Sequence, residues 1–259
     1  MSACIVTSRA SSGALKIAEK ADLFVVRNNR LPHLRHTLAF NWGSHEIAHR
    51  PNQRVLNPAA AVHRSSDKAL ALPVLHEAGV PVPPFGRSAE QLLARHPIVL
   101  ARTTTRGSEG AGIVVIRRGD PITRAPLYTG YIEKTLEYRV HICNGRAIHI
   151  QQKRKRNGYE RNRDDLLLRN VSHGWVFTEN GLTCDTDGTR QQLEDVSVHA
   201  VSALGLDYGG VDVIRARSNG TYVILEVNSM PGIESSRTTE AWSSAFTALA
   251  TNNNARGGQ

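Results

Sequence analysis

The sequence predicts an α+β protein in which a small α/β lobe precedes two further lobes built largely from β-hairpins. Residues 1–62 alternate short apolar runs with one helical segment, which is the pattern of a small α/β unit. Further along, apolar runs flank turn signals at Asn144-Gly145 and at 217–220, and each signal indicates a hairpin. An amphipathic segment at 191–204 predicts a helix that leads into the second hairpin.

Composition limits the class of protein. A chain of 259 residues with 40% hydrophobic content can form one large domain or two to three smaller lobes. The cysteines Cys4, Cys143 and Cys184 show no paired spacing, which favours a reducing compartment and argues against a disulfide scaffold or a zinc site. No apolar run approaches the roughly 20 residues that span a bilayer, and the first residues lack a signal-peptide core. We therefore expect a cytoplasmic protein with no membrane partner.

The formal net charge of +9 favours polyanionic partners, namely nucleotides, nucleic acid or acidic peptides, although solubility alone would also explain it. Aromatic residues make up only 5% of the chain, which is sparse for a surface that stacks bases. Nucleic-acid binding therefore stays open as the less favoured alternative.

The N-terminal lobe is expected to cover residues 1–62. A strand, a helix and a further strand follow one another before a polar region, and two more strands come after it. The predicted strands are 4–6, 23–26, 37–46 and 54–57, and the predicted helix is 14–21.

The second lobe is expected over residues 63–127. Ser65, Ser66 and Asp67 form a helix N-cap region before KALALPVLHEAG, with Gly79 at the C-cap position. Pro73 interrupts the helical pattern, so this helix is expected to kink or to begin late. A short helix at 90–95 and a hairpin with strands 98–102 and 112–117 follow. The polar hairpin loop TTTRGSEGAG could close its backbone N–H groups over a phosphate chain, although many hairpin loops look the same.

The third lobe is expected over residues 128–250, with a disordered tail at 251–259. Glu137 and Arg139 lie two apart on the first strand of the Asn144-Gly145 hairpin, so both project from one face. Residues 153–163 contain six Lys or Arg, which predicts a solvated mobile loop whose charges could also clamp phosphates.

The hairpin at 207–232 carries three oxygen-bearing side chains. Glu226 and Asn228 project from one face of its second strand, and Asp212 comes from the first strand. Two carboxylates and an amide suit Mg²⁺, which keeps its other positions for water and phosphate oxygens. A solvated polar face would explain the same residues without a metal ion.

The ordered set of motifs resembles the ATP-grasp superfamily. It comprises a helix opening at SSDK, a glycine-rich loop, a Tyr-Ile segment, a Glu-x-Arg strand, a basic loop, an Arg-Asn pair, and an Asp before Glu-x-Asn. Over roughly residues 55–235 it is most similar to carboxylate–amine ligases of the ribosomal-protein glutamate ligase type, particularly small phage-encoded members. The resemblance implies an ATP-grasp fold, with two α+β lobes gripping ATP, behind a small α/β N-terminal lobe.

The resemblance implies roles residue by residue. The residues implied in ATP binding through phosphate, adenine or ribose are Lys68, Arg102, Gly107, Ser108, Gly110, Tyr131, Ile132 and Glu137. The implied catalytic residues near phosphate or substrate are Arg139, Lys153, Arg169 and Asn170. The implied metal ligands are Asp212, Glu226 and Asn228.

Three positions carry a reservation. Most members have a lysine where this chain has Arg102, and arginine reaches and hydrogen-bonds differently. Arg139 and Arg169 would also fit as structural ion-pair partners.

The implied reaction is ATP-dependent ligation. A carboxylate attacks the γ-phosphate to give an acyl phosphate, and an amine then displaces phosphate; the protein supplies positioning and positive charge. The implied cofactors are ATP and Mg²⁺, with two ions expected and Mn²⁺ able to substitute. The carboxylate substrate would be a small molecule, an amino acid or a peptide. The identities of both substrates and the oligomeric state stay open.

Two alternatives keep the nucleotide site. One is modification of a nucleic-acid base, favoured by the +9 charge and the 153–163 run. The other is a non-catalytic nucleotide-binding module, which Arg102 favours and the intact metal-ligand set opposes.

Overall fold

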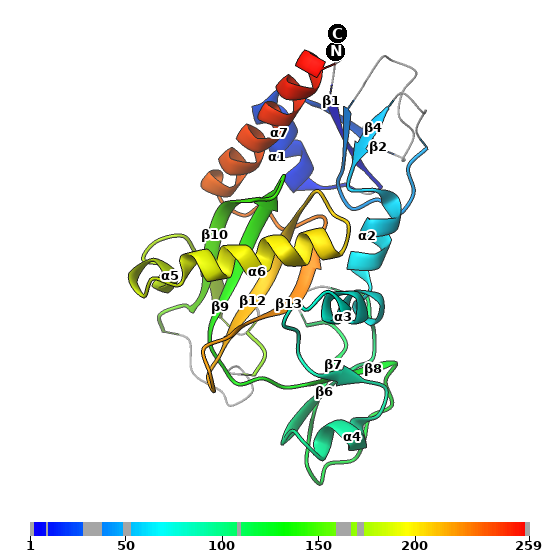
Figure 1. The fold of residues 1–259 in the computed structure, drawn as a ribbon, viewed down its shortest axis with the longest axis vertical. Helices are drawn as coiled ribbons and strands as arrows, with labels where there is room; N and C mark the ends of the chain where they lie inside the picture. Colours follow the sequence, from blue (N-terminus) through cyan, green and yellow to red (C-terminus); the bar gives the residue numbers. More distant parts are fainter. Residues whose placement is uncertain are drawn as a thin grey trace.

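The computed structural model describes residues 3–8, 10–27, 38–48, 53–107, 110–158, 167–169 and 174–256. These residues form three sheets, stacked along the long axis of the molecule with a helical layer beside each (Figure 1). Among them, no helix combines the length and the apolarity needed to cross a membrane.

The N-terminal lobe is a parallel sheet in the order β2-β1-β3-β4. Ser11 caps the first helix by accepting a hydrogen bond from the Ala14 N–H, which explains why that helix begins earlier than predicted. The last helix of the chain packs against the first (Figure 1). The elements are β1 (Ala3–Thr7), α1 (Ser12–Ala21), β2 (Phe24–Arg27), β3 (Leu38–Asn41), β4 (Arg54–Leu56) and α7 (Ser236–Arg256).

The small lobe is an antiparallel sheet in the order β5-β8-β6-β7. Asp67 is the N-cap of α3, as predicted, and α3 stays helical through Pro73 without a late start. A separate helix, α2, precedes it and runs across the expected boundary at residue 62. The elements are α2 (Ala59–Ser66), α3 (Lys68–Glu77), β5 (Phe85–Gly86), α4 (Ala89–Leu93), β6 (Ile98–Arg102), β7 (Ile113–Arg117) and β8 (Leu127–Gly130).

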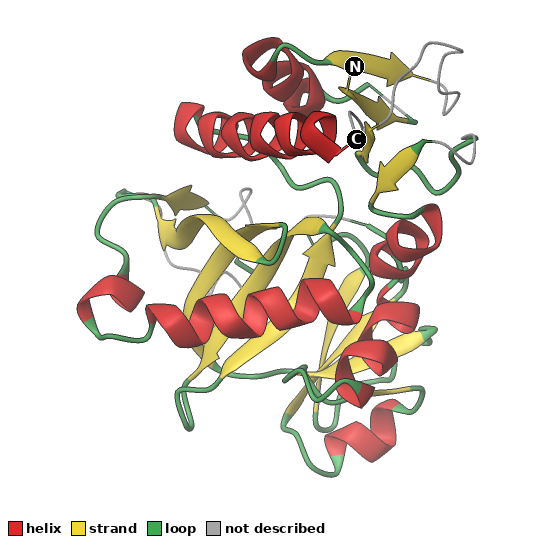
Figure 2. Ribbon diagram, turned by 45° about the horizontal axis from the view of Figure 1, so that its top comes forward, coloured by secondary structure: helices red, strands yellow, loops and turns green. Residues whose placement is uncertain are grey.

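The large lobe is an antiparallel sheet in the order β11-β10-β9-β12-β13, with α6 lying across one face (Figure 2). Both predicted hairpins, β9–β10 and β12–β13, are present. The elements are β9 (Lys134–Cys143), β10 (Arg146–Lys155), β11 (Trp175–Thr178), α5 (Thr183–Thr186), α6 (Arg190–Ala203), β12 (Tyr208–Ala216) and β13 (Tyr222–Asn228).

Side-chain alternation decides what the large sheet presents on each face. Val140 and Val211 belong to the buried core that includes Leu193 and Val201 of α6. Their chain neighbours Arg139 and Asp212 therefore project from the opposite face, toward the small lobe. Because the apolar side of α6 covers one face of the sheet, the other face is free to carry charged groups.

Two expectations outside the site have clear outcomes. All three cysteines, Cys4, Cys143 and Cys184, are buried and none forms a disulfide bond in the structure. The expected tail at 251–259 is wrong in part, because α7 continues to Arg256. The sequence contains no glycine or proline between Ser236 and Arg256 that would stop the helix, and Gly257 is the first such residue.

Candidate active site

A cavity of about 420 Å³ lies between the small lobe and the charged face of the large sheet. Every predicted site residue that the structure describes lines this one cavity; the other two, Ser108 and Asn170, lie outside the described residues. The lining residues from the prediction are Lys68, Arg102, Gly107, Gly110, Tyr131, Ile132, Glu137, Arg139, Lys153, Arg169, Asp212, Glu226 and Asn228.

Two carboxylates face each other across the β12–β13 hairpin. Asp212 and Glu226 are opposite partners in its register, and Gly210 lies opposite Asn228. The Asn228 Nδ2 donates to Glu226 Oε1 at 3.0 Å, which leaves the amide oxygen unbound by that contact. The hairpin therefore gathers two carboxylates and one amide at a single point of the cavity wall.

Each of these carboxylates is held by a cation. Arg139 donates to both oxygens of Asp212, at 2.7 Å from Nε and 3.0 Å from Nη2. Lys68 Nζ lies 2.5 Å from Glu226 Oε2. Burial alone would raise the pKa of Glu226, but Lys68 and the Asn228 amide hold it at about 2. The pKa of Asp212 stays raised by burial and by the neighbouring Glu226 charge, despite Arg139.

The donor set fits a hard divalent cation. Its atoms are carboxylate and amide oxygens, which Mg²⁺ prefers over nitrogen or sulfur. Burial and the neighbouring Glu226 charge raise the pKa of Asp212, so Arg139 compensates the negative charge of this carboxylate only in part. Among the described residues no group of three His, Cys, Asp or Glu side chains is gathered, so Asn228 is needed to complete the set.

A second charged group surrounds Glu137. Lys153 Nζ donates to Glu137 Oε1 at 2.6 Å, and Lys134 Nζ lies 3.5 Å from Oε2. Burial would raise the pKa of Glu137, yet these lysines and nearby Arg169 lower it overall. Burial likewise lowers the pKa of Lys134. Glu137 is therefore ionised and flanked by two lysines.

Sequence reasoning missed Lys134, and the reason is geometric. Strict alternation would place it on the opposite face from Glu137. An irregularity in the β9–β12 pairing, between Arg215 and Ala216, changes the register beside Lys134 and brings its side chain into the cavity. Such a bulge has no clear signal in this sequence.

Arg102 is a buried cation with an incomplete set of partners. Its Nε has no hydrogen-bond acceptor among the described residues. Burial lowers the pKa of its guanidinium, although the charge of Glu226 opposes the shift. A buried guanidinium with free donor capacity suits an anionic ligand such as phosphate.

The two arginines with an expected alternative role behave differently. Arg139 forms the ion pair with Asp212, stacks 4.5 Å over Phe177, and still lines the cavity. Arg169 donates to the backbone carbonyls of Lys134 and Thr135, at 3.2 to 3.4 Å, and has no described carboxylate partner. Arg169 therefore buttresses the start of β9 from within the cavity.

The glycine-rich loop is tied to the start of α3. The Lys68 N–H donates to the Thr105 carbonyl at 2.9 Å, and Arg106 Nε donates to Asp67 at 3.1 Å. Gly112 has a φ of 70° and a Cβ there would lie 2.7 Å from Thr104 Cγ2, so the turn requires glycine. The loop and Lys68 therefore meet at the same end of the cavity.

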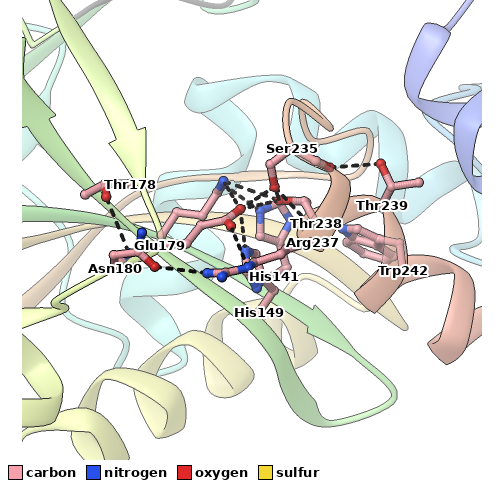
Figure 3. Close-up of polar contacts among 11 residues, drawn as sticks. His141, His149, Thr178, Glu179, Asn180, Ser235, Arg237, Thr238, Thr239 and Trp242 are labelled. Carbon is pink, nitrogen blue, oxygen red and sulfur yellow. Dashed lines mark hydrogen bonds and ion pairs between the residues drawn. The ribbon is translucent and has the colours of Figure 1, made fainter.

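The segment after Asn228 also forms cavity wall. Met230, Pro231, Gly232 and Glu234 line it, while Ser235 does not. Figure 3 shows that Ser235 turns instead toward Glu179. The Pro231-Gly232 pair is a turn signal that could have indicated this part of the cavity wall, but sequence reasoning did not identify Glu234.

Comparison with known proteins found a matching domain family and several distant relatives of this chain. Residues 176–245 match the RimK-like ATP-grasp domain family. The chain is 27% identical over 198 residues to a probable alpha-L-glutamate ligase of Xanthomonas euvesicatoria pv. vesicatoria strain 85-10, and 25% identical to one of Haemophilus influenzae strain ATCC 51907 / DSM 11121 / KW20 / Rd. Each alignment covers 69% of this chain, which spans only 61% and 60% of those relatives.

Solved structures resemble the whole chain. The ATP-grasp ligase PsnB, complexed with minimal precursor, Mg and ADP, superposes with a TM-score of 0.66 at 14% identity, covering 97% of this chain and 96% of that one. D-alanine–D-alanine ligase from Bacillus anthracis superposes with a TM-score of 0.60 at 12% identity, covering 97% and 99%. The chain therefore has the ATP-grasp fold, as its motif order predicted.

Proposed function

We propose that this chain, which has the ATP-grasp fold, is an ATP-dependent carboxylate–amine ligase. The observation that carries the proposal is one interlobe cavity holding six cationic side chains beside two carboxylates and an amide. This arrangement suits a polyphosphate bound with its metal ion. The cations are Lys68, Arg102, Lys134, Arg139, Lys153 and Arg169.

The nucleotide's position follows from the lining. The apolar end near Tyr131 and Ile132 would take the adenine, and Glu137 would bond the ribose hydroxyls. The Tyr131 N–H already donates to the Ile98 carbonyl at 3.0 Å, so Tyr131 would contact adenine through its carbonyl. Lys68 and Arg102 would hold the phosphates beneath the glycine-rich loop.

The metal ligands would be Asp212, Glu226 and Asn228. Mg²⁺ bound there would neutralise charge on the transferring phosphate, and two ions are expected. Arg139 and Lys153, together with Arg169, would orient the reacting carboxylate. Asn170 and Ser108 keep the roles that the family resemblance implies.

The proposed reaction has two steps. A substrate carboxylate oxygen attacks the γ-phosphorus, the bond to the β-phosphate oxygen breaks, and ADP leaves. An amine nitrogen then attacks the acyl carbon, phosphate leaves with the electron pair, and the nitrogen loses its proton to solvent. Because water would hydrolyse the acyl phosphate, carrying out both steps within the cavity between the lobes would limit that loss.

L-Glutamate is the first amine to test, since the curated relatives are probable alpha-L-glutamate ligases. The carboxylate substrate would be an amino acid or a peptide. No described contact in the cavity favours modification of a nucleic-acid base over ligation of an amino acid or a peptide.

A hydroxylamine trap tests the proposal. The purified protein would be incubated with Mg-ATP, hydroxylamine and pooled amino acids and short peptides, and hydroxamate and ADP would be measured. We expect both products from the natural chain and neither from Glu226→Gln. Mg-ATP binding without turnover under all conditions would instead indicate a non-catalytic nucleotide-binding module.

A further inference from the structure

Among the described residues that line the cavity, one carboxylate has no ion-pair partner. Glu137, Asp212 and Glu226 are each bonded to a lysine or an arginine. Glu234 also lines the cavity but has no hydrogen-bond or ion-pair partner among the described residues. The cavity wall is otherwise rich in cations, and the proposed ATP and metal site assigns no role to this carboxylate.

Glu234 lies at the phosphate end of the cavity. A Cβ placed on Gly232 would be 3.5 Å from Glu234 Oε1 and 3.6 Å from Arg139 Nη1, so the two charged groups flank the same glycine. Arg139 in turn bonds Asp212, at 2.7 Å from Nε and 3.0 Å from Nη2. A ligand group bound to Glu234 would therefore sit beside the metal-ligand cluster.

The backbone around Glu234 is anchored on both sides. Ile233, the preceding residue, is buried in the core of the N-terminal lobe. The following residue, Ser235, donates to Glu179, which also accepts from His149 at 3.0 Å and Thr238 at 3.3 Å (Figure 3). The backbone of Glu234 is thus fixed, while its side chain is exposed to solvent at the edge of the cavity.

Further hydrogen bonds fix the position of the Glu179 side chain. Gln151 Nε2 donates to Glu179 at 3.3 Å, and its Oε1 bonds the fully buried His141 at 3.1 Å. Trp242 Nε1 donates to the other nitrogen of His141, so that ring is neutral with its proton on Nε2. Burial lowers the pKa of His141 to about 3, which agrees with this assignment. The chain of bonds joins the large sheet to α7.

We propose that Glu234 binds the amine co-substrate as an ammonium group, which loses one proton to solvent before its nitrogen attacks the acyl carbon. This inference rests on the proposed ligase function and adds a substrate class to it. A cavity lined by six cations repels an ammonium group. Among the described residues, Glu234 supplies the one cavity carboxylate without an ion-pair partner near the reacting end. The acceptor is therefore a primary amine that is charged at neutral pH, as in amino acids and peptides.

The same argument separates this class from neutral amines. An exocyclic amine of a nucleobase carries no positive charge, so Glu234 would give it no electrostatic advantage. Hydroxylamine, which is uncharged at neutral pH, provides a matched probe for the same step.

The test compares two amines in three proteins. ADP release and amide formation would be measured against the concentration of L-glutamate, and hydroxamate formation against that of hydroxylamine. The proteins are the natural chain, Glu234→Gln, and the control Glu240→Gln, which alters an exposed acid on α7 that pairs with Lys20.

We expect Glu234→Gln to raise the KM for L-glutamate about tenfold to a hundredfold, the loss of one hydrogen bond to a charged group. Its KM for ATP and its hydroxamate rate should match those of the natural chain and of Glu240→Gln. An unchanged KM for L-glutamate, or a parallel fall in the hydroxamate rate, would overturn the inference alone. If the natural chain forms no hydroxamate, the proposed function fails and the inference with it.

Discussion

Replacing Lys68 with methionine would isolate the contribution of one cation to the carboxylate pair. Lys68 Nζ lies 2.5 Å from Glu226 Oε2, and the two side chains are only 15% and 20% exposed. Methionine keeps the length of the side chain and removes its charge. In the ligand-free protein the change therefore leaves Glu226 ionised and without its strongest partner.

The magnitude follows from the pKa of Glu226, which is about 2 instead of the ordinary 4.5. At about 1.4 kcal/mol per pKa unit, ionised Glu226 contributes roughly 3 kcal/mol to folding at pH 7, of which Lys68 supplies the largest attractive part. Because the folded-state pKa is depressed, this stability is present above the unfolded value and is lost as the pH falls toward 2. Lys68→Met should therefore cost up to about 3 kcal/mol at pH 7 and about 1 kcal/mol at pH 3.

Urea unfolding at the two pH values measures both quantities. Lys20→Met is the control, because its partner pair with Glu240 is 49% and 65% exposed and should contribute less than about 1 kcal/mol. Equal losses at pH 7 and pH 3, or a loss no larger than the control's, would refute the electrostatic argument.

Three further outcomes are expected. Arg139→Met leaves Asp212 buried without its partner and should lower the free energy of unfolding by about 3–5 kcal/mol in urea; a loss below 1 kcal/mol would contradict the buried pair. Asp212→Asn should keep the far-ultraviolet circular dichroism spectrum and abolish ADP release, and an active variant would remove Asp212 from the metal set. Gly210→Ala places a Cβ 2.5 Å from the Cβ of Pro231 and should cost about 1–3 kcal/mol in thermal unfolding, whereas Gly86→Ala, with open space around it, should be near neutral.

Local pattern was enough to predict the frame of the site. Strict alternation placed Glu137 and Arg139 on one face of their strand, and the structure has both lining the cavity. Alternation works there because the amphipathic helix α6 covers the other face of the sheet and fixes which side chains turn inward. Tyr131, Ile132 and the residues of the glycine-rich loop followed from the family resemblance that the order of motifs supports.

Contacts between distant segments could not be predicted in the same way. Lys134 enters the cavity through a pairing irregularity, and Glu234 faces it because Ile233 and Ser235 are anchored on either side. The Glu179 anchor joins β10, the segment after β11 and the start of α7, which lie far apart in the sequence. No local spacing rule encodes such a junction.

The pairing of charges in the ligand-free protein bears on how the proposed site would work. Lys68 and Arg139 neutralise the carboxylates that would otherwise repel each other on adjacent strands. A divalent ion bound by Asp212 and Glu226 would take over that neutralisation, freeing Lys68 for the nucleotide phosphates and Arg139 for the reacting carboxylate. Metal and nucleotide should therefore bind cooperatively, and Lys68→Met should weaken Mg-ATP binding while strengthening the binding of Mn²⁺ alone. Isothermal titration with each ligand separates the two effects, and a fall in both affinities would show that Lys68 does not compete with the ion.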